Sequence, residues 1–227
     1  MKKALQIALR TTVVTLLLTG IIYPYAITGL AQILFPSRAN GSLVTDKAGK
    51  LIGSELIAQP FMNPAYFQPR PSAAGEKGYD ATSSGGSNLG TTSKKFQDRA
   101  AGDVKRLNEE NPDAPGAIPV ELVTASGSGL DPDLSPWAAL WQAPRIAKAR
   151  KISMEQVKAA VESAVEGRTL GFLGEPRVNV LRMNLALDSQ FGRPVPVPGQ
   201  DRKEEKTDAG KVAPAGAQPA TDAAPQK

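Results

Sequence analysis

The sequence predicts a loop-rich α+β domain, held at a membrane by a single N-terminal transmembrane helix and followed by a disordered tail. Three observations predict this arrangement. Residues 11–37 contain no charged side chain. Residues 37–190 alternate turn-rich segments with helix-like and strand-like ones. Residues 191–227 are rich in Pro, Ala, Gly and Lys, and they carry too few apolar side chains to offset the entropy of ordering.

The uncharged stretch predicts a transmembrane helix over residues 11–36. As a helix, the 27 residues from Thr11 to Ser37 would extend about 40 Å, which exceeds the roughly 30 Å of bilayer hydrocarbon. The alternative is a cleaved signal peptide, because Gly29-Leu30-Ala31 has small residues at a suitable spacing. The apolar run is longer than a signal peptide needs, so we favour a retained helix.

Charges around this stretch predict its orientation. Lys2, Lys3 and Arg10 precede it, and the positive-inside rule then places residues 1–10 in the cytoplasm. A single crossing puts residues 37–190 outside, as an extracytoplasmic soluble domain. Membrane lipid is therefore an expected partner, and anionic headgroups would attract the basic N-terminus.

The first half of the domain carries signals for strands, a loop and a helix. Residues 43–45 and 51–52 predict a hairpin, whose turn contains a glycine. Residues 60–90 are dense in Pro, Gly, Ser and Asn and predict a long packed loop. Residues 93–111 have apolar side chains at helical spacing, and the Asn-Pro pair at their end predicts a stop. Residues 118–125 alternate and predict a strand.

Two helices with recognisable caps and a last strand complete the domain. Ser135-Pro136 predicts the start of a helix that runs to about Arg150 and is kinked or divided by Pro144. The segment 153–156 reads as a capping box for a further helix that ends by residue 167. Residues 178–187 alternate and predict the final strand.

The composition excludes several kinds of site. The 227 residues include no Cys and no His, which excludes disulfides, thiol nucleophiles and zinc sites of the ordinary ligand types. A catalytic triad in its usual form is also excluded. The formal net charge of +5 comes from interspersed charges rather than a basic stripe, so we expect no nucleic-acid partner. We expect neither catalytic residues nor a metal site.

Five segments, in this order along the chain, carry a family resemblance. They are YPYAITGLAQILFP, GSELIAQPFMNPAYFQPRPSA, GYDATSSGGSNLG, SGSGLDPDLSPWAALWQAPRIAKAR and LGFLGEPRVNVLRMNLALD. Together they closely resemble the C subunit of the bacterial Kdp potassium-transporting ATPase, from the membrane helix to about Asp188. Five ordered motifs are far more specific than any one of them alone.

The resemblance implies an accessory, non-catalytic subunit of a potassium-uptake complex in the bacterial inner membrane. The implied partners are a channel-like potassium-binding subunit, a P-type ATPase subunit and a very small membrane peptide. The implied role is in assembly and as a catalytic chaperone that raises the ATP affinity of the ATPase subunit. No cofactor is expected to bind this chain firmly, because ATP would be reached through the ATPase subunit.

The sequence departs from the family pattern at three positions. Asp133 stands where the pattern has His, Thr91 where it has Pro, and the His before the GRxLG segment is replaced around Ala164. A role that required either imidazole cannot operate in this chain. The backbone-shaping Gly and Pro residues remain, so the resemblance holds.

A Gly-rich loop is the candidate for contact with a nucleotide or another anion. It consists of Ser84, Gly85, Gly86, Ser87 and Asn88, whose backbone N–H groups and side chains resemble an anion-binding nest. The loop also resembles the signature loop of ABC-type ATPases, although that signature has Gln where Ser87 stands. No Walker A motif occurs in the chain. We favour a simple tight turn, because the expected placement outside separates this loop from cytoplasmic ATP. Indirect stimulation of the ATPase subunit is the resulting hypothesis.

Other polar residues are candidates for binding partner subunits. They are Tyr23, Pro24, Gly29 and Gln32 in the membrane stretch, and Arg70, Asp131, Gln142, Arg145 and Arg150 in the domain. For the polar residues of the domain, hydrogen bonds that hold loops to the core are an equally good interpretation. Asp131-Pro132-Asp133 offers oxygen ligands for a cation, but two carboxylates on a proline turn more often form Asx turns.

Two further function classes stay open. One is a membrane-anchored envelope hydrolase that uses a Ser with a Lys base, although no such pair is recognisable in the sequence. The other is a membrane-anchored binding module for a small anion, which would depend on the Gly-Gly loop. Activity of the isolated domain on ester or peptide substrates would support the hydrolase.

Overall fold

A long N-terminal helix opens the structure, a computed structural model that describes residues 1–46 and 49–195. The helix runs from Lys2 to Leu34 as α1 (Lys2–Leu17), a π-helical turn η1 (Leu18–Ile22) and α2 (Tyr23–Leu34). Within the described part of the chain, it is the one helix long and apolar enough to cross a membrane. Its apolar window is not buried against the rest of the chain.

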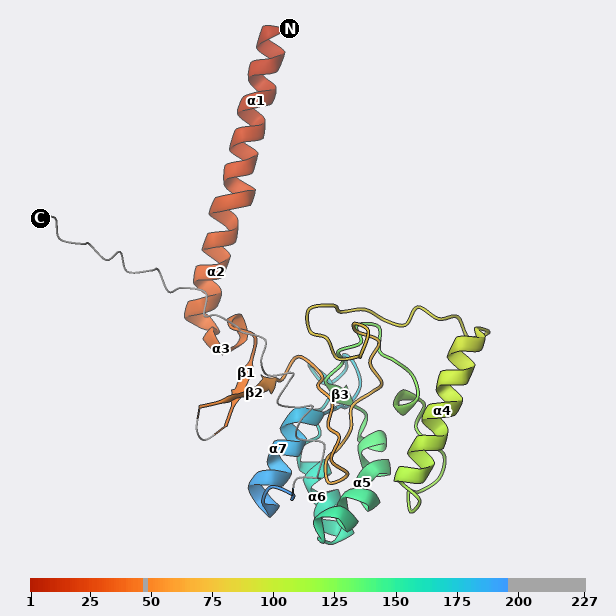
Figure 1. Ribbon diagram of the computed structural model, residues 1–227. Coiled ribbons are helices and arrows are strands. Elements are labelled where there is room, and N and C mark those ends of the chain that lie inside the picture. The colour runs from red at the N-terminus through yellow and green to blue at the C-terminus, as the bar shows by residue number, and fades with distance from the viewer. Residues whose placement is uncertain (47–48, 196–227) are drawn as a thin grey trace, which may run out of the picture. The chain divides into compact units, whose positions relative to one another are not determined.

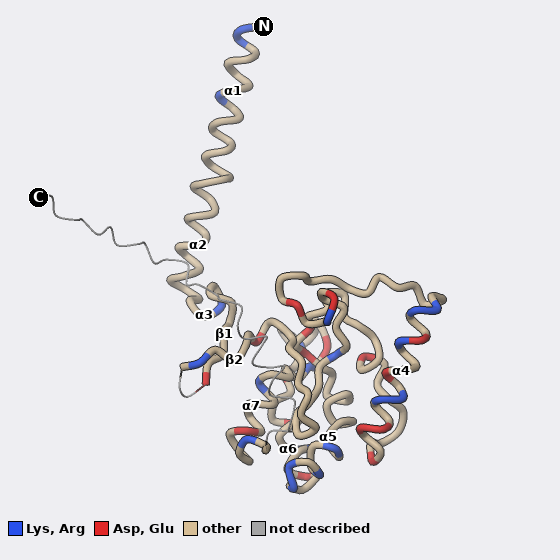
Figure 2. The backbone as a smooth tube through the Cα atoms, viewed as in Figure 1, with Lys and Arg blue, Asp and Glu red and all other residues tan. Residues whose placement is uncertain are grey.

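The helix begins at Lys2, well before the predicted start of the transmembrane segment at Thr11. Charged residues lie only in its first turns (Figure 2). Lys, Arg, Gln and Ala all favour helix, so the backbone stays helical where the apolar character stops. The change in polarity therefore marks an expected membrane boundary rather than the end of the helix.

Pro24 explains the wide turn within this helix. A proline has no N–H for the carbonyl four residues earlier, and its ring crowds that carbonyl. In the turn before Pro24, the Tyr23 N–H donates instead to the Leu18 carbonyl, five residues back. This π turn lets the helix pass the proline without ending.

A short elbow and a hairpin connect the helix to the rest of the chain. The helix α3 (Pro36–Ala39) follows at once, and the side-chain amides of Gln32 and Asn40 exchange two hydrogen bonds of 3.2 and 3.3 Å. The strands β1 (Leu43–Thr45) and β2 (Leu51–Ser54) then pair antiparallel (Figure 1). The predicted hairpin is confirmed.

The long loop predicted over residues 60–90 is also confirmed, and it is packed. No helix or strand interrupts residues 55–93, all of which the structure describes. Phe67 is 1% exposed and Ala74 is 0% exposed, so this irregular segment contributes side chains to the core.

The helix α4 (Lys94–Glu110) lies at the edge of the domain (Figure 1). Leu107 is its one buried residue. Asn111 ends the helix as predicted, with a φ of −128° that leaves the helical region.

The strand predicted over residues 118–125 is wrong. This segment contains a single turn of 3₁₀ helix, η2 (Val120–Leu122). Its hydrogen bonds are local, from the Leu122 N–H to the Pro119 carbonyl and from the Val123 N–H to the Val120 carbonyl. An alternating sequence becomes a strand only when another strand pairs with it, and no strand among the described residues pairs with this segment.

Both predicted helix caps are confirmed. The helix α5 (Pro136–Arg150) begins at Ser135, whose hydroxyl accepts from the Ala138 N–H. The helix α6 (Met154–Ser163) begins with a complete capping box, formed by Ser153 and Gln156. Pro144 does not divide α5, which continues through it as one helix.

The strand predicted over residues 178–187 is largely wrong. The strand β4 (Val178–Asn179) pairs antiparallel with β3 (Asp133–Leu134), and the chain then turns into the helix α7 (Val180–Phe191). The Asn179 side chain caps this helix by accepting from the Arg182 N–H. The apolar residues of this segment also fit a helical period, and packing against α6 favours the helix over the strand.

The core lies between α5, α6, α7 and the long loop (Figure 1). Its largest fully buried side chains include Trp141 and Ile146 from α5, Val157 and Val161 from α6, Met183 and Leu187 from α7, and Phe67 from the loop. The mixed helix and strand content of the predicted α+β class is confirmed, with less strand than predicted. The predicted tail 191–227 lies almost wholly outside the described residues, although α7 includes its first residue.

Candidate functional site

Two buried side-chain amides bind the backbone of the long loop. Asn184 on α7 accepts from the Phe67 N–H at 2.8 Å and donates to the Phe67 carbonyl at 3.0 Å. Gln142 on α5 does the same for Gln68, at 2.9 and 3.0 Å. Each amide thus satisfies the N–H and the carbonyl of one loop residue, as a neighbouring strand would, although the loop belongs to no sheet among the described residues.

Two guanidinium groups bind the adjacent carbonyls of the same loop. Arg145 donates to the carbonyls of Pro64 and Tyr66, the second at 3.1 Å. Arg150 donates from Nε to the Ala65 carbonyl at 2.8 Å. We call the four side chains that bind residues 64–68 the loop clamp; they are Gln142, Arg145, Arg150 and Asn184. The clamp satisfies five consecutive carbonyl groups.

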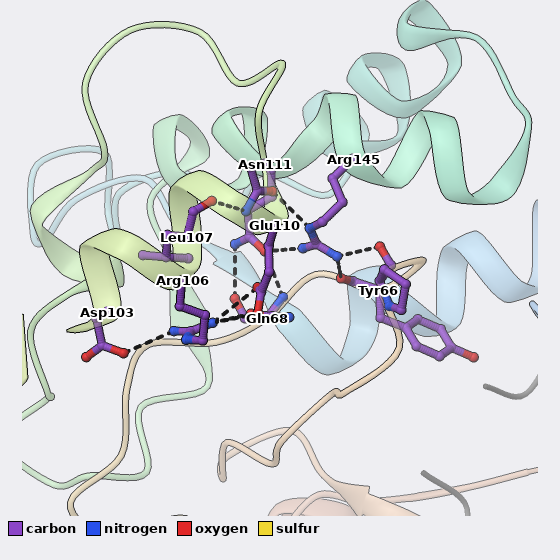
Figure 3. Close-up of polar contacts among 10 residues, drawn as sticks. Tyr66, Gln68, Asp103, Arg106, Leu107, Glu110, Asn111 and Arg145 are labelled. Carbon is purple, nitrogen blue, oxygen red and sulfur yellow. Dashed lines mark hydrogen bonds and ion pairs between the residues drawn. The ribbon is translucent and has the colours of Figure 1, made fainter. Parts of the chain in front are cut away.

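The loop clamp also reaches α4. Arg145 donates from Nε to Asn111 Oδ1 at 2.9 Å and from Nη2 to Gln142 Oε1 at 2.8 Å. Figure 3 shows the guanidinium between Asn111, at the end of α4, and Tyr66 on the loop. Burial lowers the pKa of Arg145 to about 10, so the group stays a cation at neutral pH.

Arg150 is held at the other end of the clamp. Its side chain is 3% exposed and lies 2.8 Å from Asp188, whose other carboxylate oxygen accepts from the Tyr66 hydroxyl at 2.8 Å. The guanidinium also lies over the Tyr66 ring, 5.0 Å from its centre. Burial, together with the neighbouring Asp188 carboxylate, raises the pKa of the Tyr66 hydroxyl.

These contacts bear on three of the residues predicted to bind partner subunits. Gln142 and Arg145 are 1% and 8% exposed. The polar atoms of these two side chains and of Arg150 all have partners within the chain, which are the loop, Asn111, Asp188 and Gly192. Of the two interpretations of these residues, the geometry supports hydrogen bonds that hold a loop to the core. Binding of a partner at this surface stays a prediction. Sequence reasoning missed Asn111 in this network, because it was noted only as a helix stop.

Arg70 and Asp131 form an ion pair of 3.0 Å at a half-buried position. Asp131 also accepts from the Asp133 N–H at 3.1 Å, which is the Asx turn that the sequence suggested. The Asp133 carboxylate lies 3.2 Å from Arg177. Both carboxylates are therefore paired with arginine, and the described residues contain no group of three potential metal ligands.

The Gly-rich loop packs against a second glycine turn, residues 126–129. The Ser84 hydroxyl and the Gly85 N–H both donate to the Ser128 carbonyl, at 3.0 and 2.8 Å. At Gly86 a Cβ would lie 3.0 Å from the Gly127 carbonyl oxygen, so the two backbones approach as closely as glycine allows. These contacts join two loops that are 44 positions apart at Ser84 and Ser128, and residues 84–88 form no turn of their own, so the simple tight turn favoured from the sequence is not what the structure shows. Ser87 and Asn88 follow in the same loop, and Asn88 has a φ of +50°.

The predicted partner-binding residues of the membrane stretch lie on α2. Tyr23, Pro24, Gly29 and Gln32 are all exposed along this helix. Gly29 has no atom within 4 Å of the position of a Cβ, so its surface is open to another helix. Gln32 is paired with Asn40, which ties the end of α2 to the elbow that follows it.

A family model described as "K+-transporting ATPase, c chain" matches residues 5–189. The chain belongs to the KdpC family. A KdpC subunit of a potassium-transporting ATPase from Myxococcus xanthus is 61% identical over 189 residues, which cover 83% of this chain and 89% of that relative. Another, from Rhodospirillum rubrum, is 53% identical over 191 residues, which cover 84% of this chain and 98% of that relative. Proteins of this family are named as subunits of the ATPase, and the chain is accordingly an accessory subunit rather than an enzyme by itself.

Asp133 has a defined structural environment. Its carboxylate contacts Arg177, and it accepts from Asn179 Nδ2 at 3.3 Å. Burial raises the pKa of Asp133, and the nearby Arg177 opposes that rise. Asp133 therefore links β3 to Asn179 of β4 by a hydrogen bond and to Arg177, just before β4, by an ion pair.

Proposed function

We propose that the chain acts in assembly of the potassium-transporting ATPase and as a catalytic chaperone that raises the ATP affinity of its P-type ATPase subunit. The long exposed helix carries this proposal. A helix from Lys2 to Leu34 whose apolar window is not buried by the rest of the chain needs lipid or other helices around it. We place this helix in the inner membrane, against a channel-like potassium-binding subunit, the ATPase subunit and a small membrane peptide.

The proposed action is indirect. With residues 1–10 in the cytoplasm and residues 37–190 outside, the domain is separated by the membrane from the site of ATP hydrolysis. The chain then raises ATP affinity by binding one conformation of the complex more tightly than another. The loop clamp supports this, because its hydrogen bonds tie an irregular segment to the helices of the core, through which such a preference could act.

The Gly-rich loop is assigned no direct contact with ATP in this proposal. The Ser84 hydroxyl and the Gly85 N–H already bind the Ser128 carbonyl, so fewer donors are free for a phosphate. ATP reaches the complex through the ATPase subunit, and this chain holds no cofactor firmly.

Single cysteines test the orientation, since the chain has none of its own. Lys77→Cys and Lys3→Cys both place a thiol at an exposed position. In right-side-out spheroplasts, a membrane-impermeant maleimide is expected to label Lys77→Cys before lysis and Lys3→Cys only after it. The opposite order would place the domain with ATP, and direct nucleotide contact would then be the better explanation.

A glycine variant tests the indirect mechanism. Gly85→Ala adds a methyl group that would have no atom within 4 Å, so the fold is expected to tolerate it. In an anion-binding nest, by contrast, the methyl group would crowd a phosphate that approaches the backbone N–H groups. The apparent KM for ATP of the purified complex is expected to stay within about twofold of the wild type, a change of about 0.4 kcal/mol. A large rise of this KM in an intact complex would show direct contact. Omitting the chain altogether is expected to prevent assembly or to raise the KM.

A further inference from the structure

Three exposed apolar side chains lie within four residues on one loop. Leu170, Phe172 and Leu173 are 79%, 69% and 49% exposed. We call residues 168–175 the apolar loop. Single exposed apolar residues are ordinary on a protein surface, but several on one turn indicate a binding surface. None of these three side chains is used by the loop clamp or by the core.

The backbone of the apolar loop is closed and well defined. Thr169 and Leu173 exchange two backbone hydrogen bonds of 2.9 Å. Behind them, Glu166 and Arg177 exchange two more, of 2.8 and 3.0 Å. Leu170 has a φ of +54°, in a region that a leucine rarely adopts. The fold therefore maintains a strained turn that points apolar side chains at solvent, which has no benefit to the isolated chain.

The charges around the apolar loop neutralise one another. Arg168 lies 2.7 Å from Glu175, and Arg177 lies 2.9 Å from Glu166. Residues 164–177 contain no Lys, Trp or Tyr. A membrane surface selects unpaired basic residues with interfacial Trp or Tyr. An apolar tip surrounded by paired charges instead resembles the centre and rim of a protein interface.

We propose that the apolar loop inserts into an uncharged apolar recess on the extracytoplasmic face of another subunit of the same ATPase complex. This inference rests on the proposed function, because it requires the complex and the outside placement of the domain. The contact added to the proposed function is specific. Phe172 fills the recess, Leu170 and Leu173 flank Phe172, and the paired charges form the polar rim.

A matched pair of variants in the co-expressed complex tests the contact. Phe172→Ser removes the proposed anchor, and Val120→Ser removes an apolar side chain that is 72% exposed elsewhere in the domain. After purification through a tag on this chain and dilution in detergent, Phe172→Ser is expected to retain partner subunits about tenfold less well. Val120→Ser is expected to match the wild type. Equal retention by Phe172→Ser and the wild type would overturn the inference.

Cross-linking distinguishes a protein recess from lipid. Phe172→Cys can be labelled with benzophenone maleimide, because the chain has no other thiol. Irradiation of the complex in membranes is expected to give a covalent adduct with a partner subunit, and an adduct with lipid alone would overturn the proposal. If the wild-type chain itself recovers no partner subunits, the proposed function fails. If it recovers them and the loop variants behave as the wild type, only this inference fails.

Discussion

Asn184 and Phe67 are 117 positions apart in sequence, yet the side-chain amide of one pairs with both backbone groups of the other. The amide accepts at 2.8 Å and donates at 3.0 Å, and Asn184 is 1% exposed. A buried asparagine thereby completes the backbone of a segment that has no strand beside it. The same device at Gln142 makes the long loop part of the core.

Replacing Asn184 by Leu is expected to lower the free energy of unfolding by about 3 kcal/mol, because a buried N–H and a buried carbonyl lose their partners. Urea unfolding of the full chain in detergent, followed by the fluorescence of its two tryptophans, would measure it. Asn108→Leu is the matched control, since Asn108 is exposed on α4, and it is expected to change stability by less than about 0.5 kcal/mol. Similar losses in both variants would contradict the role given to the amide.

Gly129→Ala and Gly127→Ala are expected to differ sharply, although both lie in one turn. At Gly129 a Cβ would lie 2.5 Å from the Gly85 carbonyl oxygen and 2.7 Å from the Ala74 nitrogen, at a φ of +68°. At Gly127 it would meet nothing within 4 Å. Thermal unfolding is expected to show a loss of about 2–4 kcal/mol for the first and almost none for the second. A stable Gly129→Ala variant would mean that the Gly-rich loop does not dock on this turn.

The stability of the chain is expected to fall as the pH rises above about 10. Burial raises the pKa of the Tyr79 hydroxyl from 10.0 to about 12. Between these values the folded state keeps a proton that the unfolded state has lost, so the free energy of unfolding decreases by up to about 1.4 kcal/mol per pH unit. This contribution is fully present below pH 10.

The Tyr79→Phe variant isolates this effect. Below pH 10 it is expected to be about 1 kcal/mol less stable than the wild type, since the hydroxyl donates to the Arg70 carbonyl at 2.9 Å. Because phenylalanine does not ionise, the difference is expected to shrink above pH 10, to vanish near pH 11 and to reverse by pH 12. Unfolding by urea at several pH values would measure it, and a constant difference would exclude Tyr79 as the titrating group.

Pro24→Ala is expected to convert the π turn of Leu18–Ile22 to ordinary α-helix, since the missing N–H is restored. Losing the extra residue of that turn rotates one end of the helix against the other by about 100°. The faces that pack on partner helices would then no longer match, and recovery of partner subunits with the tagged chain is expected to fall. Ile27→Ala, which shortens an exposed side chain of the same helix, serves as the control. Full recovery with Pro24→Ala would show that the wide turn is dispensable.

Several elements could be predicted from the sequence because their causes are local. The caps at Ser135 and Ser153 depend on hydrogen bonds to residues three positions away. The stop at Asn111-Pro112 depends on the proline ring and its neighbour. The long exposed helix follows from an uninterrupted run of apolar residues. The five ordered motifs likewise identified the family, and the family model that matches residues 5–189 confirms it.

The fate of two predicted strands and the formation of the loop clamp were decided by tertiary structure alone. Alternation over residues 118–125 and 178–187 fits a strand, but a strand needs a partner, and packing offered these segments a local turn and a helix instead. Gln142, Arg145 and Asn184 were visible as polar residues among apolar ones. Their partners lie 74 to 117 positions away, at distances where no local pattern links donor to acceptor. Local chemistry in the sequence therefore determined the starts of α5 and α6 and the end of α4. The folded core decided which buried polar group completes which backbone, because only burial makes an unpaired group costly.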